Sequence, residues 1–520
     1  MSVIEAARAE ITGVADAHGL AKKLIPDREL CPGSAAAVAK LPAFGEKLRA
    51  CERLTGTAFG ALAHEVQELL VLRRLEQMVN TVRLNPLWRE RLRAAGLESG
   101  PLRSYEDWQR IPLTDKAAQR ELHMGERPGL VVPMDGGGFE VVASGGTSDG
   151  QPLEIVYSLR ELADTYRIAG RFMGEHQLPR YLEGPGPRWL FTNLADYQMW
   201  SSGTMVGGVL AQVPGINYIG AGPVTAPVLE HMFSYPGPKA MMGITAGIGI
   251  LSELGAGMNQ AARESFRVAL YGSGVLAQHK RAELKALYPN LTILSYFAAT
   301  QAETIGLQLR EEDPALAAVP GLHLIEVVDR DGREVPEGAE GELVVTRLHA
   351  HETPLLRLKL GDRMVRRPRL TSPGLHTTRF EFAGRTGDVL HLNDSQYSAV
   401  GAYRALREQV QTAAGVDLEA VAQEIQFVNH RESRFLTLIV ACDDAEGLTA
   451  KLDQTLGAPG IRYAYLNALP RSLSLFNHGE ANPASIEKTG YAFHLELVPR
   501  HSPRIERTAV GKVPLVVDRG

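Results

Sequence analysis

The sequence has 520 residues, of which 44% are hydrophobic and 22% are charged, and its formal net charge is −5. This composition is that of an ordinary globular protein with room for about three domain-sized units, and the lack of a basic excess argues against nucleic acid as a partner. Three cysteines, Cys31, Cys51 and Cys442, lie far apart without a CxxC pair. They indicate a reducing compartment and offer no zinc site of the usual cysteine spacing.

The N-terminal part of the chain is predicted to be helical. It begins "MSVIEAARAEITGVADAHGL", with acids where a secretory signal needs a basic start and an apolar core, so we expect a cytoplasmic protein. Over residues 1–125, apolar residues recur at intervals of three and four, as in "FGALAHEVQELLVLRRLEQMVNTVRL", and "NPLWRERLRAAGL" opens with an Asn-Pro helix start. Both patterns are typical of amphipathic helices.

Between Val131 and Val345, short β-rich runs alternate with helical patterns. The strand-like runs are "RWLFTN", "RVALYGSG", "LTILSYFAAT", "LHLIEVVD" and "GELVVTRL", and the helical ones are "SLRELADTYRIAGRFM" and "LAQHKRAELKALY". This alternation predicts α/β layers.

The stretch Tyr197–Leu229 contains no charged residue, which raises the question of a membrane span. Pro214, Pro223, Pro227 and several glycines interrupt it. Because these residues break helices, we expect short strands and turns here and no contact with a membrane.

The C-terminal part reads as a second domain. "GRTGD", which ends at Asp388, is a turn-rich break, and "YRALREQVQTAA" and "EIQFVNHRESRFLTLIVAC" beyond it have their own helix–strand alternation. We predict an α/β fold in two parts. Residues 1–385 form a large multi-layer domain with β-sheets flanked by helices, and residues 386–520 form a small, mobile α+β domain.

A glycine-rich stretch between two strand-like runs is the first candidate site. Ser144 to Pro152, "SGGTSDGQP", combines glycines with small hydroxyl residues. Such a loop leaves backbone N–H groups open to a phosphate, and it is equally typical of an ordinary hairpin. It is not a Walker loop, because Gln151 and Pro152 stand where Lys and Ser or Thr are required.

Two further motifs point to other functions. "YGSGVLA" has the G-x-G-x-x-A form of a dinucleotide fingerprint, with Glu303 expected at the end of the next strand. "HAHE" is expected to put His349 and His351 on one face of a strand. A metal site is one interpretation of this pair, and a solvated or hydrogen-bonded pair is the other.

Several segments, in order, resemble the adenylate-forming superfamily and within it the phenylacetate–CoA ligase-like branch. They are "NPLWRERLRAAG", "RSYEDWQRIPLTDKAAQREL", "SGGTSDGQP", "YGSG", "SYFAATQAETIG", "PLLRLKLGD", "GRTGD" and "RIERTAVGKVPLVVD". The glycine-rich stretch resembles the phosphate loop of that superfamily. The apolar run in the last segment also predicts an ordered tail strand.

The resemblance implies a role for each matching residue. Lys512 and Thr300 would be catalytic, Thr300 by contacting the α-phosphate of ATP, and Glu303 would hold Mg²⁺. The remaining positions would bind the nucleotide: Ser144, Gly146, Thr147, Ser148 and Gly150 its outer phosphates, Ser273, Gly274 and Tyr296 the adenine, and Asp362 with Arg385 the ribose.

Two positions depart from the pattern. Gln151 replaces the usual lysine of the phosphate loop, so one positive charge on the leaving pyrophosphate is missing. In "ATQAETIG", either Gln301 or Glu303 occupies the magnesium position. We favour Glu303, because Mg²⁺ binds carboxylates better than neutral amides.

The resemblance implies an ATP-dependent ligase that activates a small carboxylic acid as an acyl-adenylate and transfers the acyl group to coenzyme A. The acid is expected to be apolar or aromatic, because Tyr197, Trp200, Met241, Met242 and Ile244 lie in stretches without lysine or arginine. Core packing explains the same residues. The alternatives are transfer to an amine or to a carrier-protein thiol, an NAD(P)-binding oxidoreductase, and a degraded nucleotide-binding protein. A homodimer is compatible with the sequence, which does not fix the oligomeric state.

Overall fold

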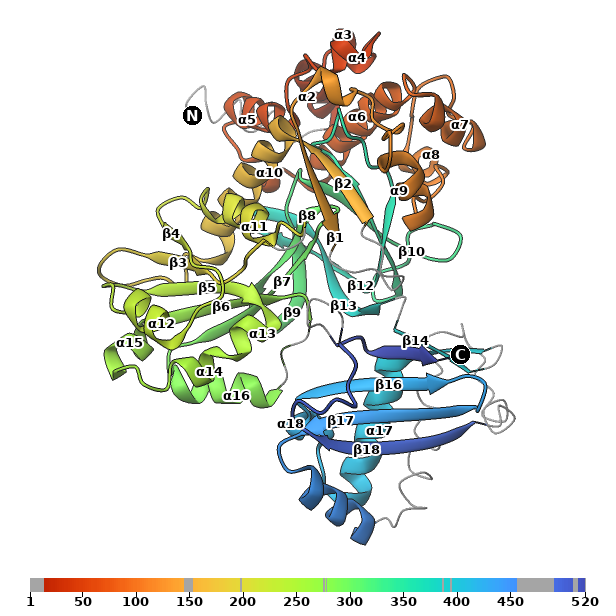
Figure 1. The fold of residues 1–520 in the computed structure, drawn as a ribbon. Coiled ribbons are helices and arrows are strands. Elements are labelled where there is room, and N and C mark those ends of the chain that lie inside the picture. The colour runs from red at the N-terminus through yellow and green to blue at the C-terminus, as the bar shows by residue number, and fades with distance from the viewer. Residues whose placement is uncertain are drawn as a thin grey trace. The chain divides into compact units, whose positions relative to one another are not determined.

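The computed structural model describes residues 14–144, 153–196, 199–274, 276, 278–385, 388–392, 395–455, 491–507 and 513–519. The chain divides into two compact units. The first comprises Met1–Val275 and Leu287–Phe382, and the second comprises Leu276–Ala286 and Ala383–Gly520. Figure 1 shows the elements of both units, which are described separately below.

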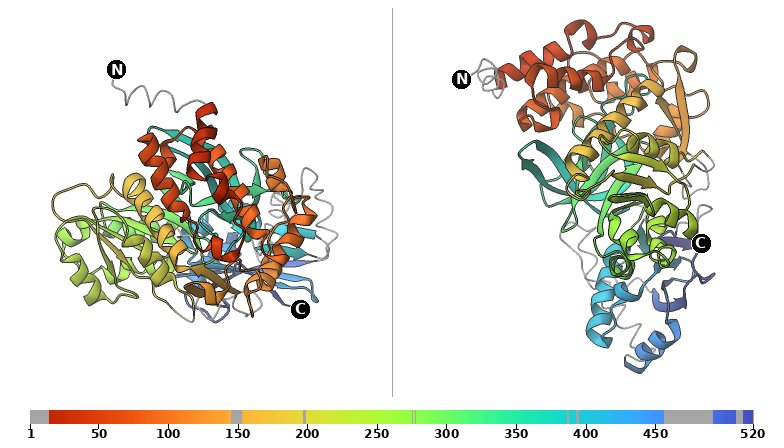
Figure 2. Two further views of the ribbon diagram at one scale, coloured as in Figure 1. Left: turned by 90° about the horizontal axis from the view of Figure 1, so that it is seen from above. Right: turned by 90° about the vertical axis from the view of Figure 1, so that its left-hand side faces the viewer.

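The first unit starts with a group of helices that gather at one end of it, in red and orange in Figure 1 and in the right-hand view of Figure 2. Asn85 caps one of them, accepting hydrogen bonds from the N–H groups of Leu87 and Trp88, so the predicted Asn-Pro helix start is confirmed. The helices are α2 (Val14–Leu24), α3 (Asp27–Leu30), α4 (Ala35–Val38), α5 (Phe44–Thr55), η1 (Phe59–Ala61), α6 (His64–Val82), α7 (Pro86–Ala94), α8 (Tyr105–Gln109) and α9 (Lys116–His123).

A large mixed sheet forms the centre of this unit, and its strand order is β10-β11-β12-β13-β9-β8-β7-β6-β5-β3-β4. The strands from β4 to β7 in this order pair in parallel, and β8 then pairs antiparallel to β7. The strands are β3 (Trp189–Thr192), β4 (Asn217–Gly220), β5 (Lys239–Ile244), β6 (Phe266–Gly272), β7 (Thr292–Ala299), β8 (Glu303–Arg310), β9 (Asp313–Ala318), β10 (His323–Val328), β11 (Glu340–Arg347), β12 (Leu358–Ser372) and β13 (Leu375–Arg385).

Helices cover the parallel part of the sheet. Helix α11 packs against β3 and β4, and α13 packs against β5 and β6. Buried aliphatic residues of β5, β6 and β7, such as Met242, Leu270 and Leu294, join one hydrophobic core. These helices and their neighbours are η2 (Met134–Gly136), α10 (Leu159–Phe172), η3 (Met173–Gln177), α11 (Ser202–Leu210), α12 (Ala226–Phe233), α13 (Thr245–Gly249), α14 (Leu251–Leu254) and α15 (Gln260–Ser265).

The uncharged stretch after Tyr197 differs from the sequence expectation of short strands and turns. It contains the helix α11, the strand β4 and the start of α12. Pro227 lies in the first turn of α12, where a missing N–H group costs no hydrogen bond. Among the residues that the structure describes, no helix has the length and apolar character needed to cross a membrane.

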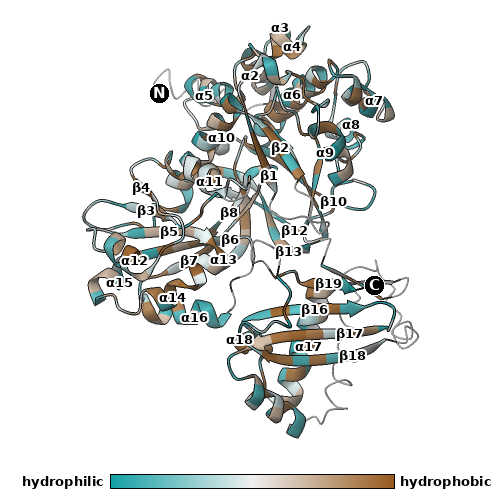
Figure 3. Cartoon of the chain, viewed as in Figure 1, coloured by the Kyte–Doolittle hydropathy of each residue, from teal (hydrophilic) through white to brown (hydrophobic). Residues whose placement is uncertain are grey.

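The second unit contains a four-stranded sheet of order β18-β17-β16-β19 and a two-stranded antiparallel sheet of β14 and β15. Strand β17 is brown along most of its length in Figure 3 and belongs to the core that packs against the helix α17. The predicted tail strand is confirmed as β19, which pairs in parallel with β16. The elements are α16 (Gln278–Leu287), β14 (Val389–Leu392), β15 (Ser395–Ser398), α17 (Ala399–Ala414), α18 (Leu418–Val421), β16 (Glu424–His430), β17 (Phe435–Cys442), β18 (Ala492–Pro499) and β19 (Val516–Arg519).

Candidate active site

The carboxyl ends of three neighbouring parallel strands bring several predicted residues together. Ile244 at the end of β5 lies beside Gly272 at the end of β6, and β6 pairs in the same direction with β7. The hydroxyl of Thr245 donates to the carbonyl of Gly272 over 3.0 Å, which joins the loops after β5 and β6. In open α/β sheets, ligands bind beyond this edge of the parallel strands.

The "YGSG" motif forms a tight turn at this edge. Ser273 has a φ angle of 64° and Gly274 a φ angle of 154°, both in the left-handed region that favours glycine. Gly272 lies against the ring of Tyr296, because a Cβ atom at Gly272 would lie 2.6 Å from ring atoms Cε2 and Cζ. The Tyr296 hydroxyl donates to the carbonyl of Gly243 over 3.2 Å. The result is a buried ring beneath an exposed strip of backbone.

A short turn joins β7 to β8 and contains Thr300. Ala299 and Glu303 face each other across the hairpin, and Glu303 has a φ angle of 48°. The hydroxyl of Tyr157, on the separate strand β2 (Leu153–Ser158), donates to the carbonyl of Thr300 over 2.6 Å. Gln301 is half-buried in the same turn. The two strands and Tyr157 therefore hold the backbone of this turn.

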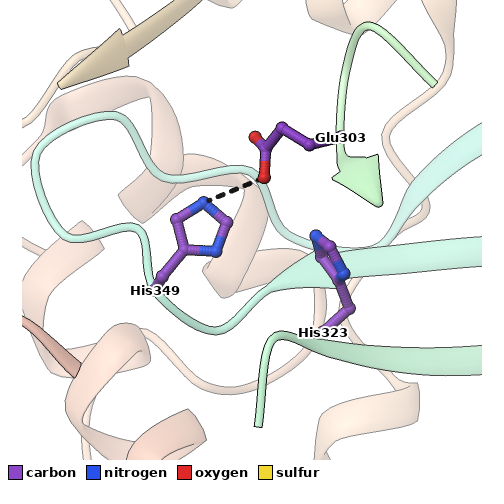
Figure 4. Close-up of side chains that lie close together, drawn as sticks. All are labelled: Glu303, His323 and His349. Carbon is purple, nitrogen blue, oxygen red and sulfur yellow. Dashed lines mark ion pairs between the residues drawn. The ribbon is translucent and has the colours of Figure 1, made fainter. Parts of the chain in front are cut away.

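Glu303 is buried, and its carboxylate faces two histidines (Figure 4). Its Oε2 lies 3.8 Å from Nε2 of His349, and His323 lies on the other side. Burial raises the pKa of Glu303 to about 7, although Arg347 nearby opposes this. Burial also lowers the pKa of His323 to about 3 and that of His349 well below its ordinary value, so both imidazoles are neutral.

The expected strand placement of "HAHE" is wrong, because His349 and His351 follow the end of β11 and do not share the face of a strand. Both are buried, so a solvated pair is excluded, whereas the hydrogen bond of His351 agrees with a hydrogen-bonded one. Nδ1 of His351 lies 2.9 Å from Nη1 of Arg74, whereas His349 turns toward Glu303. The two histidines are in different surroundings because this segment is a turn.

The dinucleotide fingerprint is also wrong for this structure. Glu303 was expected to end the strand after "YGSGVLA", but it begins β8, which runs antiparallel to its neighbour. Glu303 lies opposite Ala299, the last residue of β7, but its carboxylate is buried beside His349 and is not exposed to a ribose.

The other predicted residues are placed as follows. Ser144 ends β1 (Phe139–Ser144), which pairs antiparallel with β2, so the glycine-rich stretch does connect two strands. Asp362 is buried in β12, directly after Gly361 with a φ angle of 81°. Arg385 is exposed in the second unit, and its N–H donates to Asp388 over 3.2 Å. Gly146, Thr147, Ser148, Gly150 and Lys512 lie outside the described residues.

The residues expected near the acid differ in burial. Met241 and Met242 are fully buried, and Met242 packs in the core of the sheet, so core packing accounts for it. Ile244 and Trp200 are half-buried, and Tyr197 lies outside the described residues.

Sequence reasoning missed a buried ionic network beneath this site. The fully buried Arg74 donates to the carbonyls of Leu348 and Ala350 over 2.6 and 3.1 Å. Glu161 accepts the N–H groups of His351 and Glu352. No local pattern identifies these residues, because the members come from α6, α10 and the segment after β11 and meet only in the folded chain.

Neither family models nor the curated proteins contain a match to this sequence. Solved structures do match. A 2-hydroxyisobutyryl-CoA ligase in the postadenylation state, in complex with 2-HIB-AMP, has a TM-score of 0.64 and 18% identity, covering 89% of this chain and 91% of that one. The acyl acid amido synthetase AtGH3.15 in complex with 2,4-DB has a TM-score of 0.55 and 13% identity, covering 86% and 94%.

Both similarities extend over most of each chain, and the mixed α/β architecture predicted from the sequence is confirmed. At these identities they define the fold, while the phenylacetate–CoA ligase-like branch stays a prediction. This chain therefore has the fold of the acid-activating, adenylate-forming enzymes that its motifs resemble.

Proposed function

We propose that the protein uses ATP to activate a carboxylic acid as an acyl-adenylate, releases pyrophosphate, and transfers the acyl group to the thiol of coenzyme A. The proposal rests on one observation: Thr245, Ser273 and Gly274 lie close together at the carboxyl edge of the parallel strands. The motifs also follow one another in the expected order. A protein of similar fold has been solved with 2-HIB-AMP and CoA, at a TM-score of 0.59.

The adenine site fits a planar base. The turn at Ser273 and Gly274 is exposed. A Cβ atom added at Gly274 would lie 3.3 Å from the hydroxyl oxygen of Thr245, so the backbone here is closely packed on that side. Tyr296 is fixed below Gly272 by its hydrogen bond to Gly243. Flat backbone over a fixed aromatic ring is a surface on which a base stacks. Asp362 and Arg385 are proposed for the ribose hydroxyls.

The phosphates are proposed to contact the loop after Ser144, with Thr147, Ser148 and Gly150 supplying hydroxyl and N–H groups, and the turn at Thr300. Mg²⁺, when bound with ATP, neutralises charge on the outer phosphates. The surroundings of Glu303 do not fit this ion, because its carboxylate lies beside two imidazoles and Mg²⁺ takes oxygen ligands. Glu303 is therefore not proposed as the magnesium ligand, although the resemblance implies that role.

Lys512 is proposed as the catalytic residue of the second domain, which would hinge near Thr386–Asp388. The attacking carboxylate and the α-phosphate are both anionic, so their approach requires a positive charge between them. A lysine ammonium supplies that charge without a metal.

The acid is proposed to be apolar or aromatic. Ile244 is half-buried at the carboxyl end of β5, and Trp200 is half-buried in the segment after β3. No lysine or arginine lies in Tyr197–Leu229 to pair a second carboxylate.

Exchange of labelled pyrophosphate into ATP tests the proposal. We expect exchange only when Mg²⁺ and a suitable acid from a broad panel are present. Tight NAD(P) binding with no exchange for any acid would overturn it.

A second candidate, an amide synthetase, is favoured by the similarity to the amido synthetase. Mass spectrometry of products formed with CoA or with a panel of amines separates the two acceptors.

A further inference from the structure

Three buried side chains from separate segments of the first unit point toward one another (Figure 4). Glu303 begins β8, His323 begins β10, and His349 lies in the turn after β11. One donor atom from each, a carboxylate oxygen and two ring nitrogens, lies within 4.8 Å of the others. The two imidazole rings have centroids 5.7 Å apart and are tilted by 78°.

These side chains lack ordinary hydrogen-bond partners. Among the described residues, neither oxygen of Glu303 and no ring nitrogen of His323 or His349 has a partner with full hydrogen-bond geometry. The hydroxyls of Tyr157 and Thr165 lie close enough to Glu303 to lower its pKa, and the backbone of Leu322 acts on His349. Exposures of 6%, 8% and 1% for Glu303, His323 and His349 exclude bulk water. The hydroxyl of Tyr157 donates to the carbonyl of Thr300 over 2.6 Å, which leaves Glu303 with a weaker share of this donor. Because buried polar atoms are nearly always partnered, so many unpartnered atoms at one place indicate a ligand.

The backbone that carries these groups is held firmly. Glu161 on α10 accepts the N–H groups of the two residues that follow Ala350, and Arg74 on α6 donates to the carbonyls on either side of His349. His323 lies opposite Arg347 in the ladder between β10 and β11. The donor atoms are therefore presented by fixed segments, as a metal site requires.

Two buried arginines oppose a cation here: Arg74, whose charge acts on His349, and Arg347. The positive charge of Arg347 acts on Glu303, His323 and His349 alike. Its guanidinium lies 4.4 Å over the ring of Tyr157, and its Nη2 donates to the carbonyl of Thr353. Nε and Nη1 of Arg347 have no partner among the described residues. The rival arrangement is therefore a direct ion pair between Arg347 and Glu303.

We infer that Glu303, His323 and His349 bind one divalent transition-metal ion of the zinc type. Two imidazoles and one carboxylate are a ligand set of Zn²⁺ and Fe²⁺, whereas Mg²⁺ takes oxygen ligands. A tetrahedral zinc ion places its ligands about 3.3 Å apart, so side-chain movements of about 1 Å close the site. The ion cross-links β8, β10 and the segment after β11, and a water molecule occupies its fourth coordination position.

Metal analysis of the full-length protein, purified without chelators, tests this inference independently of the proposed function. We expect about one zinc or iron ion per chain. Removing it with a chelator should lower the melting temperature, and Zn²⁺ should restore it where Mg²⁺ does not. Co²⁺ added to the metal-free protein should give the visible absorption bands of a site with nitrogen ligands.

Single substitutions locate the site. His323→Asn and His349→Asn should each weaken Zn²⁺ binding at least tenfold. His123→Asn is the matched control, because His123 is equally buried with both ring nitrogens unpartnered among the described residues but does not belong to the cluster. It should bind zinc as the wild-type protein does.

Three results would overturn the inference: a metal-free protein whose melting temperature does not respond to Zn²⁺, equal zinc binding in both variants of the cluster, or equal loss in the His123 control. The Co²⁺ spectrum of the wild-type protein decides the matter if a variant does not fold. Bound zinc without pyrophosphate exchange would contradict only the proposed function, and exchange by a protein that binds no transition metal would contradict only the metal site.

Discussion

Gly272→Ala should damage both the packing and the nucleotide site, because the added methyl group meets the ring of Tyr296. The new Cβ atom would lie 2.6 Å from Cε2 and Cζ of that ring and 3.0 Å from Cδ2. Ordinary carbon–carbon contact is about 3.5–4.0 Å, so the ring must move by about 1 Å. Tyr296 is 8% exposed and belongs to a packed core, which leaves the ring little room.

Overpacking of this kind costs about 1–3 kcal/mol of unfolding free energy. If Tyr296 is the floor of the adenine site, a displacement of that size should also raise the KM for ATP about tenfold, since small misplacements of a binding surface are costly. Urea unfolding measures the first effect, and ATP–pyrophosphate exchange at varied ATP measures the second. Gly19→Ala on α2 is the matched control, because an added Cβ there meets nothing within 4 Å and alanine favours the helix.

The unfolding free energy and the KM for ATP can change independently of each other. A destabilised variant with an unchanged KM for ATP would show that Tyr296 does not contact the nucleotide. An unchanged unfolding free energy would show that the ring yields freely and that the packing argument is mistaken.

Lys512→Ala should abolish adenylate formation, with a loss of about a hundredfold or more, yet leave much of the transfer from a synthetic acyl-adenylate to CoA; single-turnover assays of each half-reaction measure this, and equal loss in both contradicts it. Arg74→Met should cost about 2–6 kcal/mol in urea unfolding, because it leaves the buried carbonyls of Leu348 and Ala350 without their donor, at about 1–3 kcal/mol each. The exposed Arg93→Met is its control, and an equal effect would refute the argument. The contribution of Glu161 to stability should fall as pH rises from about 4.5 through about 7, because burial raises the pKa of this group to about 7 and it then holds more protons in the folded than in the unfolded chain. The lowered pKa of the buried His323 gives a slope of the opposite sign, so the test is the difference between wild-type protein and Glu161→Gln in unfolding curves measured at several pH values, and identical slopes would refute the contribution of Glu161.

The sequence by itself determined the elements whose signals are local. The Asn-Pro start of α7, the strands β3, β6, β7, β10 and β11, and the tail strand β19 follow from caps and from apolar runs, which depend on neighbouring residues only. The order of the motifs also indicated the fold that the solved structures share.

The prediction of short strands and turns for the uncharged stretch after Tyr197 is wrong, because α11 and α12 form there although glycine and proline are frequent. Tertiary packing stabilises these helices, and the proline of α12 falls in its first turn. The same limit applies to "HAHE", whose spacing suggested a strand but which lies in a turn held by Arg74 and Glu161.

Only the tertiary structure decided which residues share the interior. Glu303, His323 and His349 are 20 and 26 positions apart in the sequence, and no spacing rule connects them. Antiparallel pairing of β10 with β11 brings His323 close to His349, whereas Glu303 begins β8, which is separated from β11 by β12, β13 and β9 in the sheet order. Contacts of this kind depend on strand order and register, which the pattern of any one segment does not contain.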